Sequence, residues 1–151
     1  MIETNDAGAN QVSRRALINA PANEIFDLIA NPHRHHELDG SGTVGENISG
    51  PQRVQLGDSF STHMKQFGMK YRTTSTITQF EENRLIEWQV GKVARWRYEL
   101  RAIDASTTEV TETWDVRHVP FTKMLYLTGM AGRNAKGIEA TLRQLQERFG
   151  S

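Results

Sequence analysis

The chain has 151 residues, a length that suits one domain, and its 18 basic residues balance 18 acidic ones. A neutral chain offers no overall positive field for nucleic acid or an anionic membrane, and the absence of cysteine excludes disulfides and cysteine-ligated zinc. No apolar run reaches the roughly 18 residues that a membrane span needs, and the first residues lack the pattern of a secretory signal. We therefore expect a cytoplasmic protein without nucleic acid or stable membrane insertion, whose partner is a small molecule.

The first part of the chain predicts a tail, one strand and two short helices. Residues 1–11 are polar and contain glycine, and we expect them to form a flexible tail. Residues 12–19 alternate weakly, as in a strand, and Pro21 then marks the start of a helix. That helix should end before Pro32, and residues 33–38 should form a second short helical segment.

From residue 43 to about residue 119 the pattern is that of strands joined by tight turns. The expected strands are residues 43–49, 60–67, 70–81, 84–90, 94–102 and 108–116. Residues 94–102 alternate most clearly, with charges on one side only, which is typical of an antiparallel sheet covered on one face. The other, charged side should be a solvated outer face. It comprises Arg95, Arg97, Glu99 and Arg101.

After Pro120 the apolar period changes to three or four residues, which predicts a long amphipathic C-terminal helix. Its apolar stripe consists of Leu127, Ala131, Ala135, Ile138, Leu142, Leu145 and Phe149. Gly129, Gly132 and Gly137 each weaken a helix by roughly 0.8–1 kcal/mol, so the first half of this helix either packs closely or faces open space. A row of strands with helices at both ends predicts an α+β fold, in which a curved antiparallel sheet covers the last helix.

Turn lengths give a register for the expected hairpins. A two-residue turn at Gly68-Met69 places Phe60 opposite Ile77, and the following turns extend this row across the sheet. The resulting inward row comprises Phe60, Ile77, Trp88, Trp96 and Trp114. The neighbouring inward row comprises Gln79, Ile86, Tyr98 and Glu112. In the alternative register, a bulge in the second hairpin brings Phe80 inward instead.

Glu112 interrupts the apolar alternation of its strand, so the pattern points a carboxylate inward. A buried carboxylate either finds a partner or changes its pKa. Two interpretations stay open. Glu112 is either a structural acid bonded to Tyr98 or an arginine, or a group that binds or protonates a ligand.

Two other patterns carry competing interpretations. Residues 40–45 match the letters of a dinucleotide fingerprint, but a preceding strand and a following helix are missing, so we interpret them as a glycine-rich turn. His33, His35 and His36 are clustered, yet their spacing matches no known zinc pattern. We expect no metal there and interpret the segment as a polar connector at a cavity mouth, with His33 able to meet a ligand.

Several segments resemble one known family. Residues 13–32 (SRRALINAPANEIFDLIANP) and 36–42 resemble the opening of START-like proteins of the polyketide cyclase/dehydrase group, also called SRPBCC proteins, and residues 96–100 and 108–115 resemble its last two strands. The resemblance spans residues 12–149 and implies the helix-grip fold. In that fold a seven-stranded antiparallel sheet wraps a long C-terminal helix, and two short helices follow the first strand. Members bind lipids, sterols and other hydrophobic molecules, or cyclise polyketides.

The leading hypothesis is that residues 12–151 form a single START-like domain that binds or transports a small hydrophobic molecule (lipid, sterol or polyketide-like) in a cavity between sheet and helix. The expected ligand-binding residues are Phe60, Ile77, Trp88, Trp96, Tyr98, Glu112, Trp114, Met130, Asn134 and His33. The alternative is a cyclase-, aromatase- or dehydratase-type enzyme in which Glu112 and Tyr98 act as acid/base groups. Neither hypothesis calls for a metal or a cofactor, and we expect a monomer or homodimer.

Overall fold

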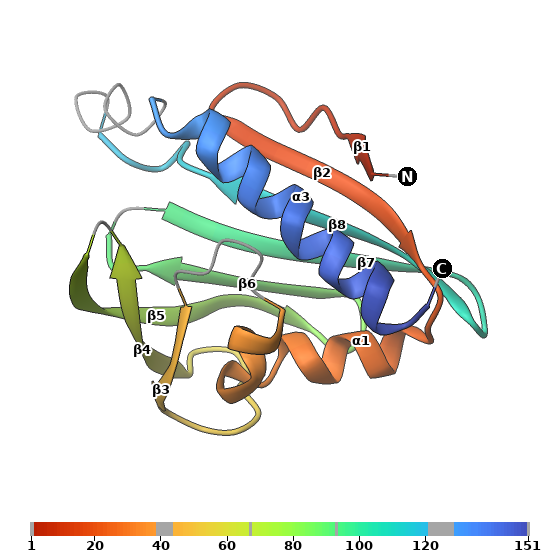
Figure 1. The fold of residues 1–151 in the computed structure, drawn as a ribbon, viewed down its shortest axis with the longest axis horizontal. Helices are drawn as coiled ribbons and strands as arrows, with labels where there is room; N and C mark the ends of the chain where they lie inside the picture. The colour runs from red at the N-terminus through yellow and green to blue at the C-terminus, as the bar shows by residue number, and fades with distance from the viewer. Residues whose placement is uncertain (1, 39–43, 67, 93, 121–128, 151) are drawn as a thin grey trace.

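The computed structural model describes residues 2–38, 44–66, 68–92, 94–120 and 129–150, within which eight strands form one curved antiparallel sheet (Figure 1). The strand order across the sheet is β1-β2-β8-β7-β6-β5-β4-β3. The strands are β1 (Ile2–Thr4), β2 (Gln11–Ile18), β3 (Val44–Ser49), β4 (Ser59–Gln66), β5 (Met69–Glu81), β6 (Leu85–Val90), β7 (Ala94–Asp104) and β8 (Thr107–Asp115). The helical elements are α1 (Ala22–Ile29), the 3₁₀ helix η1 (Pro32–Glu37) and α3 (Ala131–Arg148).

The two predicted short helices follow β2. Helix α1 begins after Pro21, whose fixed φ suits a helix start, and its buried face packs against β7. It ends where Asn31 precedes Pro32, because the residue before a proline is disfavoured in the α conformation. The Asn31 side chain then caps η1, since its Oδ1 accepts a hydrogen bond from the His33 N–H at 3.1 Å.

The long helix α3 crosses one face of the sheet over β2 and β8 (Figure 1). Its buried residues Ile138, Leu142 and Leu145 follow the predicted stripe and join the main hydrophobic core. The start expected at Leu127 lies outside the described residues. A Cβ added at Gly132 would meet no atom of another element within 4 Å, so this position faces open space, whereas Met130 and Ala131 beside it pack against the core.

The N-terminal residues correct one prediction. The flexible tail expected at residues 1–11 includes a strand, because β1 pairs with β2 in the register Ile2↔Ala16. Ile2 packs against the core, and the Asn5 N–H donates to the Ser13 carbonyl at 3.0 Å. The α+β helix-grip fold is confirmed, with one strand more than the seven expected. A three-residue strand is too short to show an alternating pattern in the sequence.

The register confirms the predicted inward row across the centre of the sheet. Trp88 pairs with Ile77 on one side and with Trp96 on the other, and Trp96 pairs with Trp114. In each of strands β5 to β8, the side chains predicted for this row therefore point to the same face of the sheet. The three tryptophans of the chain therefore lie side by side on one face of the sheet.

Two details of the register differ from the leading prediction. The β4–β5 turn lies one residue earlier than expected, so Phe60 is opposite Ser75; a shift of two in the pairing keeps Phe60 on the same face. In the β5–β6 hairpin a bulge places Phe80 opposite Ile86 and leaves Gln79 exposed. This bulge is the alternative register, and it removes Gln79 from the inward set.

Candidate functional site

The inner row (Phe60, Ile77, Trp88, Trp96 and Trp114) lies on the face of the sheet that carries α3, and its burial is uneven. Phe60, Ile77 and Trp114 are buried, whereas Trp88 and Trp96 in the middle of the row are only half-buried. The row adjoins the main hydrophobic core, against which both half-buried tryptophans pack. Large aromatic side chains that keep uncovered surface beside a core are typical of an apolar binding surface.

Ring contacts on three sides fix the position of Trp88. Its ring centroid lies 5.7 Å from that of Tyr98 and 5.9 Å from that of Phe60, the latter in an edge-to-face arrangement with an interplanar angle of 72°. The imidazole of His35 stacks on it at 5.1 Å and 24°. Aromatic pairs at these distances each contribute about 0.5–1.5 kcal/mol beyond area burial, so the indole is held in one orientation.

The histidine that joins the inner row is His35, and a ligand contact of His33 stays a prediction. His35 Nε2 lies 2.6 Å from the Ile29 carbonyl oxygen, which orients the ring toward the row. His33 Nε2 lies 2.9 Å from the Gly50 carbonyl oxygen and ties η1 to the loop before β4. The sequence could not separate the two, because side-chain direction in a single short 3₁₀ helix is set by its packing.

A second inward row carries polar groups. Tyr98 and Glu112 pair across β7 and β8 as predicted, and both are buried. On the other side of Glu112, β2 contributes Arg14, whose Nε donates to Glu139 Oε1 of α3 at 3.0 Å. Arg14 was not predicted as a site residue, although it lies two residues before the buried Ala16 and therefore on the same face of β2.

Met130 and Asn134 lie at the start of α3. Met130 is the N-cap residue and packs half-buried against the core, and its carbonyl accepts the Asn134 N–H at 3.0 Å. Asn134 is half-buried. Their contact with a ligand remains a prediction.

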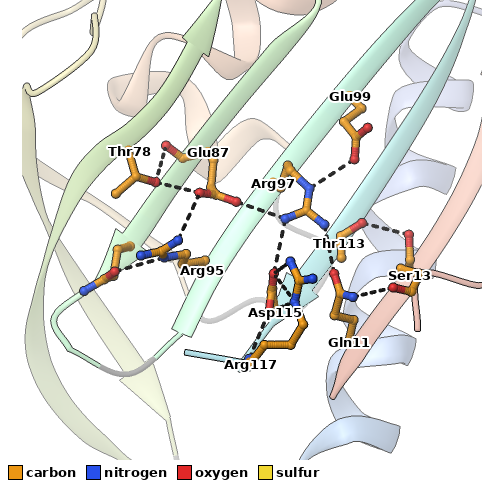
Figure 2. Close-up of polar contacts among 12 residues, drawn as sticks. Gln11, Ser13, Thr78, Glu87, Arg95, Arg97, Glu99, Thr113, Asp115 and Arg117 are labelled. Carbon is orange, nitrogen blue, oxygen red and sulfur yellow. Dashed lines mark hydrogen bonds and ion pairs between the residues drawn. The ribbon is translucent and has the colours of Figure 1, made fainter. Parts of the chain in front are cut away.

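The opposite face of the same strands carries a group of linked charges (Figure 2). We call Glu87, Arg97, Asp115, Arg95 and Arg117 the ionic cluster. Arg97 Nη1 donates to Glu87 Oε2 at 3.0 Å and to Asp115 Oδ2 at 3.3 Å, which joins β6, β7 and β8. Arg117 forms a bidentate contact with the same aspartate, in which Nη2 donates to Oδ2 at 2.7 Å and Nε donates to Oδ1 at 3.1 Å.

The burial of the ionic cluster corrects the expectation of a fully solvated outer face. The side chain of Glu87 is 1% exposed, that of Asp115 4% and that of Arg97 13%. Arg101, further along β7, is exposed as predicted. The alternation placed these residues on the correct face. It carried no information on how far neighbouring long side chains cover one another.

The pKa values of the two buried carboxyls follow from their partners. Burial raises the pKa of Glu87, but hydrogen bonds from β5 side chains and from Arg97 outweigh it, so the pKa lies below its ordinary value. Burial also raises the pKa of Asp115, and the hydrogen bonds and positive charge of Arg117 lower it further than burial raises it. Both carboxylates are therefore ionised in the folded protein at neutral pH.

The structure describes only part of the other sequence patterns. Among the described residues no three His, Asp or Glu side chains come close enough together to hold a metal, and this includes the histidines of η1. Within the same part of the chain no helix is long and apolar enough to cross a membrane. Residues 40–43 of the glycine-rich segment lie outside the described residues.

Comparisons with known proteins agree with this fold. The family described as "Polyketide cyclase / dehydrase and lipid transport" matches residues 9–150. The uncharacterized protein Rv0088 of Mycobacterium tuberculosis is 45% identical over 148 residues, 95% of this chain; the chain spans 66% of that relative's length. A Rhodobacter sphaeroides crystal structure has a TM-score of 0.74 at 13% identity, covering 98% of this chain and 97% of that one. Ms6760 from Mycobacterium smegmatis has a TM-score of 0.71 at 15% identity, covering 96% and 94%.

Proposed function

Because the chain belongs to the polyketide cyclase/dehydrase and lipid transport family, we propose that it binds a small hydrophobic molecule between the inner row and α3. The ligand class is a lipid, a sterol or a polyketide-like molecule. Its apolar body lies on Trp88 and Trp96, and its polar group lies toward Tyr98 and Glu112. The relatives named above are uncharacterized or similar in fold alone, so the ligand class rests on the chain's own residues and on the family description.

The observation that carries this proposal is the incomplete burial of Trp88 and Trp96. Each residue packs against the core yet is only half-buried, and its place in the register puts its side chain on the face that carries α3. Covering that surface with an apolar molecule gains about 25 cal/mol for each Å² removed from water. The ring contacts that fix Trp88 keep the surface preorganised, so little side-chain entropy is lost on binding.

A titration with a dansyl-labelled fatty acid tests the proposal. We expect energy transfer from tryptophan to the bound dansyl group and saturation at one probe per chain. Trp96→Leu should weaken binding about tenfold, because an indole contributes more contact area than a leucine. The matched control Ile103→Ala removes an exposed apolar side chain at the far end of β7 and should bind as the parent does. Equal affinities in both variants would refute binding on the inner row.

A second candidate function follows from the pairing of Tyr98 with Glu112. Two buried groups that can exchange protons lie directly opposite one another beside an apolar surface. Glu112 would take a proton from the carbon next to a substrate carbonyl, and the Tyr98 hydroxyl would donate a hydrogen bond to the enolate oxygen that forms. An aromatic 1,3-diketone incubated in deuterated water tests this. The enzyme hypothesis fails if the parent protein exchanges the diketone's protons no faster than Glu112→Gln does.

A further inference from the structure

The hairpin of β4 and β5 extends past the rest of the sheet at the end opposite the C-terminus (Figure 1). Strand β5 begins to pair with β6 only at Ser75, opposite Val90. The residues of β5 before that point pair with β4, down to the pair Gln66↔Met69 at the turn. Within the described residues this end of the hairpin, which we call the ribbon, therefore lacks β6 beside β5, although β3 still pairs with β4 as far as Val44↔Met64. Residues 68–72 of the ribbon are exposed.

Large apolar side chains are exposed on this ribbon. Met69 is 68% exposed and Tyr71 40% exposed, although most apolar side chains of this size in the described chain are covered. Alternation along β5 places both on the same face as Ile77 of the inner row. The apolar face of the ribbon therefore continues the face on which we propose the ligand lies.

The charge of the hairpin differs from that of the whole chain. Between Asp58 and Glu81 the sequence contains Lys65, Lys70 and Arg72 and no acidic residue, whereas the complete chain is neutral. In the backbone register Lys65 lies directly opposite Lys70. The hairpin therefore carries a net positive charge within a chain that is neutral overall.

We propose that the tip of the β4–β5 hairpin docks on an anionic lipid bilayer, with Met69 and Tyr71 entering the interface and Lys70 and Arg72 contacting lipid phosphates. Exposed apolar groups flanked by cations fit a membrane surface, where the apolar part enters the headgroup region and the long basic side chains reach the phosphates. The neutral charge of the chain does not oppose this docking, because charges more than about 8 Å apart are largely screened at physiological salt. The inference concerns a surface outside the proposed ligand site and stands without it.

Co-sedimentation with vesicles tests the proposal. We expect the full chain to bind vesicles of phosphatidylcholine mixed with phosphatidylglycerol and not vesicles of phosphatidylcholine alone. The double variant Lys70→Ala/Arg72→Ala should bind roughly 25-fold more weakly at low salt, since each cation near an anionic surface contributes about fivefold. Met69→Ser should bind about tenfold more weakly at low and at high salt, because its contribution is apolar.

Two control variants separate the hairpin from the rest of the surface. Lys136→Ala removes an exposed lysine of α3, and Ile103→Ser removes an exposed apolar side chain of β7. Both should bind vesicles as the parent does. No binding of the parent to the mixed vesicles at low salt would overturn the proposal, and so would equal losses in the hairpin and control variants. Because this assay needs no bound ligand, its failure leaves the dansyl fatty acid titration to decide the inner-row proposal separately.

Discussion

In a sheet covered on one face, charged side chains are expected to be exposed and apolar ones buried. Several residues on the two faces of β6, β7 and β8 show the reverse. On the outer face Glu87 and Asp115 are buried charges, whereas on the inner face Trp88 and Trp96 are apolar and partly uncovered. Residues of the two sets alternate along the same strands, so a single backbone positions both. The outer face thus buries two carboxylates and Arg97 behind the inner row, while Arg95 and Arg117 stay partly exposed. The two half-buried tryptophans of the inner row keep apolar surface uncovered.

The two faces also differ in how their groups are satisfied. Each buried carboxylate of the ionic cluster meets Arg97, and each has an additional donor of its own (Figure 2). Removing one member therefore leaves a buried charge without its partner. This destabilises the folded protein by more than the intact ion pair stabilises it. Substitutions in the inner row leave no buried charge unpaired, so their cost in stability is limited to lost packing and ring contacts. Changes in the ionic cluster should therefore act chiefly on stability, and changes at the half-buried Trp88 and Trp96 chiefly on binding.

The largest expected effect comes from removing the shared arginine. Arg97→Met should lower the free energy of unfolding by about 3 kcal/mol, because two buried carboxylates lose their common partner. Urea denaturation measures the change. Arg101→Met is the matched control on the same strand. Arg101 forms a surface ion pair with Glu109, and such pairs contribute about 0–1 kcal/mol, so this variant should lose little stability. Equal losses in the two variants would contradict a special role for the cluster.

The second largest effect should come from acid, which removes the stability that Glu87 and Asp115 contribute. The folded pKa values of Glu87 and Asp115 lie below their unfolded values of 4.5 and 3.8, so the stability they contribute is complete above those values and is lost as the pH falls below them. Thermal unfolding across this acidic range should show a steeper decline for the parent than for Asp115→Asn, which starts less stable at neutral pH. Glu109→Gln, at an exposed pair, should keep the parent's slope. If the melting temperature of Asp115→Asn falls with pH as steeply as that of the parent, the ionic cluster is not the cause of the acid sensitivity.

On the inner face, Glu112→Gln should change binding more than folding. The substitution keeps the size of the side chain and its place beside Tyr98 while replacing the carboxyl group by an amide. We expect roughly tenfold weaker binding of a ligand whose polar group donates a hydrogen bond to the carboxylate, in line with about 1.5 kcal/mol for such a charged hydrogen bond. Calorimetric titration and thermal melts of the same sample measure both properties. A large drop in melting temperature with unchanged affinity would make Glu112 a structural acid.

The smallest expected effect is at the start of α3. Gly132→Ala should raise the free energy of unfolding by about 0.5–1 kcal/mol, because the added methyl group meets no atom and alanine favours the helix. Chemical denaturation checks the sign. If the same variant also slows ligand release, the flexibility of this first turn serves ligand exchange. A destabilised variant would show that the turn is more crowded than the described residues indicate.

The sequence predicted the inner face better than the outer one. Strong alternation in residues 94–102 was enough to place Trp96 and Tyr98, and the row built from them is confirmed. The hairpin at Gly68 was misplaced by one residue because turn chemistry fixes the position of a loop less firmly than alternation fixes a face. The burial of Glu87 and Arg97 was missed, since it depends on side chains from several strands that a linear pattern does not bring together.

The local elements at the edges of the fold were the hardest to predict. Strand β1 has only three residues and gave no periodic signal, yet it pairs with β2 through the register Ile2↔Ala16. The choice between His33 and His35 required the packing of η1, which no spacing encodes. In both cases the missing information is a tertiary contact, so no closer reading of the sequence would have supplied it.

The proposed function requires that a hydrophobic molecule bind on the inner face while the outer face stays fixed. Nitrogen–proton correlation NMR reports both faces at once, through the indole N–H signals of Trp88, Trp96 and Trp114 and the Nε–H signal of Arg97. We would titrate the protein with a fatty acid, a sterol and an aromatic polyketide. We expect at least one of them to shift the Trp88 and Trp96 signals and to leave the Arg97 signal in place. Indole signals that stay unchanged with all three, or that move no more than the Arg97 signal, would refute binding on the inner face.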